Sequence, residues 1–326
     1  MERTKTRLGI LGAGAMGATH AAAYATMADV EVVGVFARDV EKARSVAALC
    51  KASTVIDART LIEDDRVDAI DICLPSPIHP QFAIAALDRG KHVFCETPMA
   101  LTMDEALAMR EAAHKADRLL QIGLLMRSIG AYRHVRAAVE TGDKGRLLGL
   151  STWRLGSYLR SDTPDHKSHY GDPTTELMTF DFDVANWLMG RPTQLVAGGN
   201  GEITALPRYD DGRSATIAAS GLMPAGAPFR VGFRALFEEA AFELETVFEG
   251  GPPRNTFTIV DGRSGPRPIA LPGVNPYEVE LRNFVDCVQG KADPALLNAE
   301  HAIAALALSL AAQSALATGA PVPLSG

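Results

Sequence analysis

The sequence predicts an α/β protein, in which an amino-terminal doubly wound parallel sheet precedes an α+β domain with a large open mixed or antiparallel sheet. Short apolar or β-branched runs alternate with helical patterns through residues 1–125. After Met126, strand-like runs follow one another between Gly, Pro and Asp turns. The length of 326 residues suits one large or two medium domains. We therefore expect one domain of residues 1–125 and a second of residues 126–326.

The amino-terminal segments have the character of a sheet that is covered on both faces. Their strand-like runs are apolar without alternation, which is typical of buried parallel strands. Strands are expected at Leu8–Leu11, Val30–Phe36, Ala69–Leu74, His92–Cys95 and Leu119–Gly123. Helices are expected between several of them, at Ala18–Met27, Val40–Cys50, Gln81–Arg89 and Met103–Lys115.

The second half reads as a run of strands with few helices. A helix over Tyr132–Thr141 should end at Gly142, and a helical segment at Leu177–Leu188 interrupts the strands. The expected strands are Leu147–Leu155, Gln194–Ala197, Ser214–Ser220, Arg230–Phe237, Ala241–Glu249 and Thr256–Val260. Two amphipathic helices, Pro276–Gln289 and Ala299–Thr318, are expected to close this second domain.

Composition excludes some partners. The net charge of −7 and the pI of about 5.6 argue against nucleic acid, because phosphate binding favours a basic surface. The four cysteines form no CxxC and are expected to be buried thiols in a reduced cytosol. We expect a cytoplasmic protein without a membrane span, since the apolar segment Ala302–Ala317 is alanine-rich and broken by Ser and Gln. No metal site is predicted, because His166-x-x-His169 lacks a third ligand.

The segment "LGILGAGAMGATH" contains a phosphate-binding signature. Gly12, Gly14 and Gly17 form GxGxxG directly after a strand and at the start of a helix. In this motif the first glycine allows a tight turn, the second lets the backbone approach a pyrophosphate, and the third lets the helix pack closely. We therefore predict a Rossmann domain that binds a dinucleotide, with contacts from Gly12, Gly14, Ala15, Met16 and Gly17.

The end of the second strand bears on the choice of dinucleotide. An acidic residue there would bind the 2′-hydroxyl of NAD, but Ala37 stands at the expected position, followed by Arg38. A neutral residue followed by arginine suits a 2′-phosphate. We predict a preference for NADP(H), with NAD(H) as the alternative if Arg38 is only a solvated turn residue and Asp39 binds the ribose.

The segment "LPSPIHPQFAIAALDRGKHVFCETPMALTMDEA" closely resembles the glucose–fructose oxidoreductase / inositol dehydrogenase / rhizopine catabolism (Gfo/Idh/MocA) family. The resemblance continues through "ETGDKGRLLGL", "FDVANWLMGRP" and "FVDCVQGKADP…ATGAPVPL" and so covers nearly the whole chain. It implies a Rossmann domain, a second domain whose sheet forms homodimers or homotetramers, and NAD(P)-dependent oxidoreduction of a small-molecule substrate. It also implies that the cofactor lies near Leu74, Pro75, His79, Glu96, Thr97 and Pro98. His79 could equally be a helix-start residue beside Pro80.

The resemblance breaks at the residues that carry the family's chemistry. Thr97 replaces the lysine of the family's Glu-Lys-Pro motif, while Glu176 and Phe180 replace an aspartate and a histidine and Asp183 is kept. Hydride transfer to or from a hydroxyl-bearing carbon needs a proton donor or acceptor, which a threonine near neutral pH is not. We expect the proton to be handled by Glu176, His169 or Tyr170, with Thr97 as an orienting or relaying group. The expected substrate contacts are Arg127, Tyr132, Phe180 and Asp183.

Three hypotheses follow. The favoured one is an NADP(H)-dependent oxidoreductase of a small polar, sugar-like carbonyl or polyol with a rearranged proton donor. The second is a reductase of a conjugated C=C bond or an imine, which needs less help from an acid. The third is a dinucleotide-binding regulatory protein that has lost catalysis and acts through protein partners.

Overall fold

The computed structural model describes residues 5–160, 171–262 and 265–324. The chain divides into two compact units, each built from two segments. The first unit consists of Met1–Ser128 and Val274–Ile303, and the second of Ile129–Gly273 and Ala304–Gly326.

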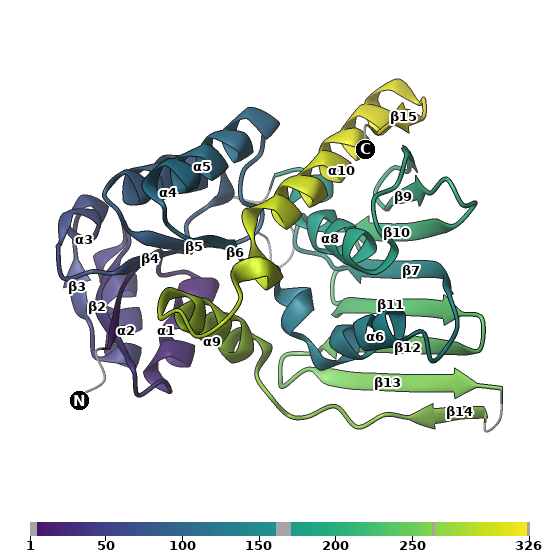
Figure 1. The fold of residues 1–326 in the computed structure, drawn as a ribbon, viewed down its shortest axis with the longest axis horizontal. Helices are drawn as coiled ribbons and strands as arrows, with labels where there is room; N and C mark the ends of the chain where they lie inside the picture. Colours follow the sequence, from purple (N-terminus) through teal and green to yellow (C-terminus); the bar gives the residue numbers. More distant parts are fainter. Residues whose placement is uncertain (1–4, 161–170, 263–264, 325–326) are drawn as a thin grey trace. The chain divides into compact units, whose positions relative to one another are not determined.

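The first unit contains a six-stranded parallel sheet in the order β3-β2-β1-β4-β5-β6 (Figure 1). The order reverses between β1 and β4, which makes the carboxyl ends of these strands the expected ligand-binding edge. The strands are β1 (Thr6–Leu11), β2 (Val30–Phe36), β3 (Ser53–Val55), β4 (Ala69–Ile72), β5 (His92–Cys95) and β6 (Leu120–Ile122). The predicted doubly wound fold is confirmed.

Helices cover both faces of this sheet, so its strands are buried as predicted. In Figure 1, α1, α2 and α9 lie on one side of the sheet and α4 and α5 on the other. The helices are α1 (Ala15–Ala25), α2 (Val40–Cys50), α3 (Ala58–Glu63), α4 (His79–Asp88), α5 (Met103–Ala116) and α9 (Pro276–Val288), with short turns η1 (Ser76–Ile78), η2 (Leu125–Ser128) and η3 (Pro294–Leu297).

Helix α9 differs from its predicted place. The sequence assigned it to the closing of the second domain, but it packs against α1 in the first unit. Its apolar side, with Leu281, Phe284 and Val285 fully buried, contacts the sheet through Phe284, whose ring lies 5.5 Å from that of Phe94. Periodicity predicts that an amphipathic helix needs an apolar partner, but it does not identify a partner so distant in the sequence.

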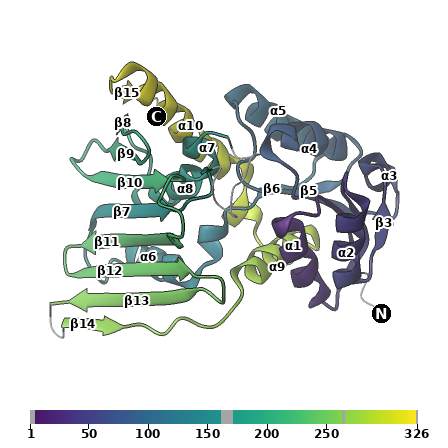
Figure 2. The ribbon, with the colours of Figure 1, turned by 180° about the vertical axis from the view of Figure 1, so that it is seen from behind.

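The second unit contains a nine-stranded mixed sheet in the order β14-β13-β12-β11-β7-β10-β9-β8-β15 (Figure 2). Strands β7 and β10 pair in parallel, and the other pairs are antiparallel. The strands are β7 (Leu147–Leu155), β8 (Gln194–Gly198), β9 (Ile203–Arg208), β10 (Ser214–Ser220), β11 (Phe229–Phe237), β12 (Ala240–Phe248), β13 (Arg254–Asp261), β14 (Gly265–Pro268) and β15 (Val322–Pro323). The predicted open mixed sheet is confirmed.

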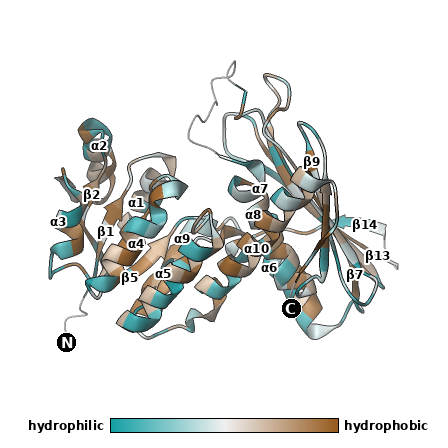
Figure 3. Cartoon of the chain, turned by 90° about the horizontal axis from the view of Figure 1, so that it is seen from above, coloured by the Kyte–Doolittle hydropathy of each residue, from teal (hydrophilic) through white to brown (hydrophobic). Residues whose placement is uncertain are grey.

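One face of this second sheet carries the helices of the unit. Helices α6 (Gly130–Thr141), α7 (Pro173–Glu176) and α8 (Met178–Met189) lie on it, and α8 contacts β7 and β10 (Figure 3). Among the described residues, no helix of this unit lies on the opposite face. Leu222, Leu236 and Phe248 are exposed in this unit, with 40–48% of their surface accessible.

The last helix, α10 (Ala299–Thr318), is long and apolar enough to cross a membrane by length and composition alone. Its residues Ala305, Leu306, Leu308, Ala312 and Ala315 are buried within the protein. A core helix of a folded protein passes the same test of length and composition as a membrane span. The burial of these residues favours the predicted core helix.

Candidate dinucleotide-binding and active site

The three glycines after β1 differ in the structural reason for which glycine is present. Gly12 has a φ of +120°, and a Cβ there would lie 2.2 Å from the carbonyl oxygen of Cys73. A Cβ on Gly17 would lie 2.0 Å from the carbonyl oxygen of Gly12, so α1 approaches the turn more closely than any side chain allows. Gly14 differs, because nothing lies within 4 Å of a Cβ built on it. The space above Gly14 is therefore open.

The start of α1 is free to bind an anion. Gly14 is the N-cap residue of α1, and no side chain caps the first amides of this helix by a hydrogen bond. The first turn also contains no acidic residue. Gly14 and Ala15 are exposed, and Met16 is half-buried. Helix N-termini present unpaired amides and a positive dipole end, which is the arrangement that binds phosphates. The loop therefore fits the pyrophosphate of a dinucleotide.

At the end of β2, Asp39 and Arg38 have different environments. Asp39 is the N-cap of α2, and its Oδ1 accepts from the amides of Glu41 at 3.1 Å and Lys42 at 3.2 Å. Arg38 is exposed and makes no ion pair with any described residue, while Ala37 is half-buried. The carboxylate is thus held by its own helix, and the guanidinium remains available to a ligand.

His79 joins the loops that follow β4 and β5. Its Nδ1 lies 2.9 Å from the carbonyl oxygen of Pro98, and its Nε2 lies 2.6 Å from that of Leu74. Burial lowers its pKa, and only 1% of the residue is exposed. The ring therefore positions Leu74, Pro75 and Pro98 and presents almost no surface of its own.

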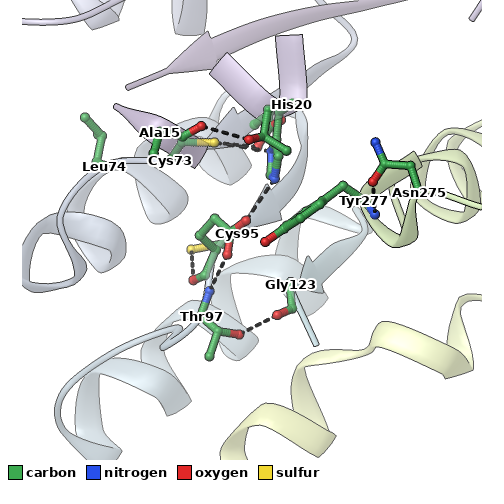
Figure 4. Close-up of polar contacts among 12 residues, drawn as sticks. Ala15, His20, Cys73, Leu74, Cys95, Thr97, Gly123, Asn275 and Tyr277 are labelled. Carbon is green, nitrogen blue, oxygen red and sulfur yellow. Dashed lines mark hydrogen bonds and ion pairs between the residues drawn. The ribbon is translucent and has the colours of Figure 1, made fainter. Parts of the chain in front are cut away.

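The hydroxyl of Thr97 donates to the carbonyl oxygen of Gly123 at 2.8 Å (Figure 4). Its amide donates to Oε2 of Glu96 at 3.2 Å. Thr97 therefore links β5 to the end of β6 and holds the Glu96 carboxylate in place.

Beside Glu96, the structure brings together a group of residues that the sequence analysis did not identify. Nε2 of His20 lies 2.8 Å from Oε1 of Glu96, and its Nδ1 lies 2.9 Å from Oδ2 of Asp71 (Figure 4). Cys73 Sγ lies 3.3 Å from the same Nδ1. Glu280, from α9, is fully buried, and neither of its carboxylate oxygens has a hydrogen-bond partner. The available signal was that His20 follows Gly17 by one helical turn and therefore faces the sheet.

The electrostatics of this group depend on burial and on its carboxylates. Burial lowers the pKa of His20, but Asp71 opposes this, and the resulting pKa is well above the ordinary value. Burial raises the pKa of Glu280 well above its ordinary value, and Glu96 adds to that rise. Burial and Asp71 likewise raise the pKa of Cys73 far above that of a free thiol. Burial and the neighbouring carboxylates therefore favour the protonated forms of the imidazole, of the Glu280 carboxyl and of the thiol.

The donor atoms of His20, Asp71 and Cys73 lie within 4.8 Å of one another, which raises the question of a metal. A tetrahedral ion with bonds of about 2.0–2.3 Å would separate its ligand atoms by roughly 3.3–3.8 Å. The 2.9 Å between His20 and Asp71 is a hydrogen-bond distance instead. We therefore interpret the group as a hydrogen-bonded cluster.

In the second unit, the candidate residues lie around α7 and α8. Glu176 and Asp183 are buried at 6% and 1% exposure, and Phe180 is half-buried. The guanidinium of Arg154 lies 4.7 Å from the centre of the Phe180 ring. Its Nε donates to Oδ2 of Asp181 at 2.6 Å.

Two predicted substrate contacts are core residues in their own units. Tyr132 is 1% exposed, and its ring lies 4.7 Å from that of Phe233. Arg127, in the first unit, is 2% exposed and donates to the carbonyl oxygen of Leu296 at 3.0 Å. The predicted His169 and Tyr170 lie outside the described residues.

The strand order of the first unit, its glycine turn and the open N-terminus of α1 together define a dinucleotide-binding protein of the Rossmann class. Residues 6–124 match a family model described as "Oxidoreductase family, NAD-binding Rossmann fold", named for Gfo/Idh/MocA.

Among curated proteins, the chain is 30% identical over 187 residues to inositol 2-dehydrogenase 2 of Saccharopolyspora erythraea, covering 56% of this chain and 54% of that protein. It is 25% identical to 1,5-anhydro-D-fructose reductase of Ensifer adhaerens, over 96% of this chain and 97% of that one. The chain thus spans about half of the first relative and nearly all of the second.

Among solved structures, a levoglucosan dehydrogenase in complex with NADH and L-sorbose shares the fold, with a TM-score of 0.84 and 19% identity over 98% of this chain and 99% of that one. The amino-terminal part of the chain is thus similar to the NAD-binding domain of Gfo/Idh/MocA oxidoreductases, and inositol dehydrogenases are among the similar curated proteins. The predicted family resemblance is confirmed.

Proposed function

We propose that this protein is a cytoplasmic NADP(H)-dependent oxidoreductase that transfers hydride between the nicotinamide cofactor and a small polar, sugar-like carbonyl or polyol. The observation that carries the proposal is the exposed N-terminus of α1, where Gly14 leaves open space beside unpaired amides. The names of the relatives, an inositol dehydrogenase and an anhydrofructose reductase, support a sugar-like or polyol substrate.

The preference for NADP(H) over NAD(H) rests on Arg38 and Asp39. The carboxylate of Asp39 is occupied by two amides of α2, so it is poorly placed to accept from a ribose hydroxyl. Arg38 is exposed and has no ion-pair partner among the described residues, so it can bind a 2′-phosphate. We assign the remaining cofactor contacts to Gly12, Gly14, Ala15, Met16, Gly17 and Ala37 in the phosphate loop and β2, and to Leu74, Pro75, His79, Glu96, Thr97 and Pro98 after β4 and β5.

The chemistry needs a proton donor other than lysine. The hydroxyl of Thr97 donates a hydrogen bond to a backbone carbonyl, and Thr97 thereby positions its neighbours. The candidates from the sequence are Glu176, His169 and Tyr170, and the proposed substrate contacts are Arg127, Tyr132, Phe180 and Asp183. Bound NADP(H) would supply or accept the hydride, while residues of the chain bind the substrate and move the proton.

Cofactor binding and turnover test the proposal separately. Fluorescence titration gives the Kd of NADPH and NADH, and we expect NADPH to bind at least about tenfold more tightly, a difference of about 1.4 kcal/mol. NADPH oxidation is then followed with a panel of ketoses, aldoses, inososes, enones and imines. Equal Kd values overturn the preference for NADP(H).

The panel also separates the rival functions. Turnover of enones or imines alone favours the second candidate, a reductase whose substrate needs little acid assistance. The presence of Thr97 and Phe180, which are not acids, supports this candidate. Tight cofactor binding without any turnover favours a regulatory protein.

We also propose that the protein forms a homodimer or homotetramer through the open sheet of the second unit. Leu222, Leu236 and Phe248 are exposed there, and burial of such side chains stabilises association. Light scattering at micromolar concentration should give a mass of two or four chains. A monomer mass overturns this proposal.

A further inference from the structure

A chain of close polar contacts runs from the interior of the first unit to the carboxyl end of β5. Asp71 lies 2.9 Å from Nδ1 of His20, and Nε2 of His20 lies 2.8 Å from Oε1 of Glu96. The other carboxylate oxygen of Glu96 accepts from the amide of Thr97. The three side chains come from β4, α1 and the loop after β5, so their alignment is a product of the tertiary fold.

The chain of contacts has one end at the surface. The side chains of Asp71 and His20 are 0% exposed, whereas that of Glu96 is 13% exposed. Of these three side chains, Glu96 is therefore the one that a ligand can reach.

The two carboxylates beside the His20 ring favour a charged imidazole over a neutral one. A neutral imidazole has one N–H, but both ring nitrogens of His20 face carboxylate oxygens at hydrogen-bond distance. The Nδ1 contact with Asp71 is a hydrogen bond, whereas Nε2 and Oε1 of Glu96 meet at ion-pair distance without hydrogen-bond geometry, so the contact with Glu96 is attractive when the ring is charged. The raised pKa of His20 agrees with a proton that the pair keeps at neutral pH.

Other ionisable groups surround the pair and limit where that proton goes. Cys73 follows β4, Tyr24 lies on α1, and Glu280 and Tyr277 lie on α9. Burial raises the pKa of Cys73, Tyr24 and Glu280, which favours their neutral forms. Tyr277 turns its ring towards His20, with the ring centroids 6.2 Å apart (Figure 4). The transferable proton thus belongs to His20 and Glu96.

The position of Glu96 in the sheet fits a catalytic role. The strand order reverses between β1 and β4, and β2, with Arg38 at its end, lies on one side of that point. In doubly wound folds the ribose next to the adenine lies at the end of β2, so the reactive end of a dinucleotide extends to the other side. Glu96 follows β5 on that other side, directly before Thr97.

We propose that Glu96 is the catalytic acid and base of this oxidoreductase, in place of the candidates in the second unit, and that His20 and Asp71 are positioning residues that supply its proton. The proposal rests on the proposed function. In reduction, the carbonyl carbon receives the hydride with its two electrons from the reduced cofactor, and the carbonyl oxygen receives the proton of Glu96. Glu96 then takes the proton from Nε2 of His20, and water returns a proton to the pair. In oxidation the same transfers run in reverse, and Glu96 accepts the hydroxyl proton.

The first test needs no turnover. The imidazole of His20 is titrated by NMR in the cofactor-free protein, in wild type, Glu96→Gln and Glu111→Gln. Glu111 is an exposed carboxylate on α5 and serves as the matched control. We expect His20 to remain charged well above pH 6.5 in wild type and control, and to lose its charge at lower pH in Glu96→Gln, because one carboxylate is gone. An unchanged titration in Glu96→Gln overturns the pairing on which the proposal depends.

The second test asks whether the pair senses the oxidation state of the cofactor. NADP⁺ and NADPH binding are measured by calorimetry in two buffers with different ionisation enthalpies, which gives the protons released. The cationic oxidised ring should drive a proton off a nearby acid, so NADP⁺ binding should release more protons than NADPH binding. This difference should vanish in Glu96→Gln and persist in Glu111→Gln. Equal release in wild type overturns the proposal, while tight binding of either form leaves the proposed function intact.

The third test uses a substrate from the panel. Glu96→Gln should lower kcat, measured at saturating NADPH, by about 10²–10⁴-fold. His20→Asn should move the pH at which reductive kcat declines to lower values, because the imidazole that keeps the proton at higher pH is gone. A purely structural role for His20 would lower the melting temperature without moving this pH. Wild-type turnover with less than about a tenfold loss in Glu96→Gln removes Glu96 as the acid but leaves the proposed function standing.

Discussion

Two alanine substitutions in the same loop should have opposite consequences for folding and for cofactor binding. In Gly17→Ala the new Cβ meets the Gly12 carbonyl oxygen at 2.0 Å, where ordinary contacts begin at 3.4 Å. The turn and α1 must separate by about 1.4 Å, and overpacking of this kind costs about 1–3 kcal/mol. For a unit of this size, each kcal/mol lowers Tm by roughly 2–4 °C. We expect Gly17→Ala to lower Tm by about 2–12 °C.

In Gly14→Ala the free protein should be nearly unaffected. The backbone at Gly14, with φ −80° and ψ −165°, is extended and open to alanine, and nothing lies within 4 Å of the new Cβ. Alanine is a weaker N-cap than glycine, at a cost of less than about 1 kcal/mol. The methyl group nevertheless occupies the space through which a pyrophosphate would approach the α1 amides. Each charge-assisted hydrogen bond lost weakens binding by about 1.5–3 kcal/mol, or roughly 10- to 150-fold in Kd.

Thermal unfolding and NADPH titration distinguish the two variants. Gly198→Ala is the matched control, because its Cβ also meets nothing within 4 Å but lies at the end of β8 in the other unit. We expect it to change neither Tm nor Kd. If Gly14→Ala binds NADPH as wild type does, the phosphate-binding role of the loop is wrong. If Gly17→Ala is as stable as wild type, the close packing of α1 on the turn is wrong.

Three further predictions follow from single side chains. Arg38→Ala should weaken NADP(H) binding by about 1.5–3 kcal/mol and leave NAD(H) binding unchanged, and equal losses for both would contradict the 2′-phosphate assignment. Thr97→Ala should lower kcat by less than about tenfold. Because the variant loses one hydrogen bond, it should lower the free energy of unfolding by about 0.5–1.5 kcal/mol. A deep loss of kcat would place the chemistry at Thr97 itself. The raised pKa of Glu280 means that the folded state holds its proton more tightly than the unfolded state. The contribution of Glu280 to the stability of the folded protein is therefore present at acidic pH and is lost as pH rises through the folded pKa. When Tm is measured from pH 5 to 9, it should fall less in Glu280→Gln than in wild type or in the control Glu278→Gln.

The fold was predictable where elements are long and bounded by clear signals. The bounds of β2, β5, β7 and β10, and those of α2 and α10, agree with the sequence prediction, because apolar periodicity and turn residues mark both ends. The missed strands β3, β14 and β15 have two to four residues, too few to display a period. Strand β9 was missed as well, since Pro207 lies within it and argues against a strand.

The candidate site was predictable only where its residues are close in the sequence. The GxGxxG motif is recognisable because its residues lie within six positions of the sequence. The tight turn at Gly12 and the close packing at Gly17 agree with the steric roles expected for them. His20 and Asp71 are 51 residues apart, and neither stands in a local pattern that signals chemistry. Glu280 reaches the same cluster from α9, which was assigned to the other domain. Such a cluster exists only after the strands and helices have packed.

The neutral side chain of Thr97 and the burial of His20 are linked through the charge of Glu96. A lysine next to Glu96 would offer it a cation from the adjacent residue. Thr97 is neutral, and among the described residues the ion pair of Glu96 is with His20. A buried carboxylate needs a partner, because an isolated charge is strongly destabilised in an apolar interior. His20 meets that need with an imidazole whose pKa Asp71 holds above its ordinary value in spite of burial, so that the charged form is favoured. Glu96 is therefore paired with an acid that can resupply it, as the proposed proton transfer requires.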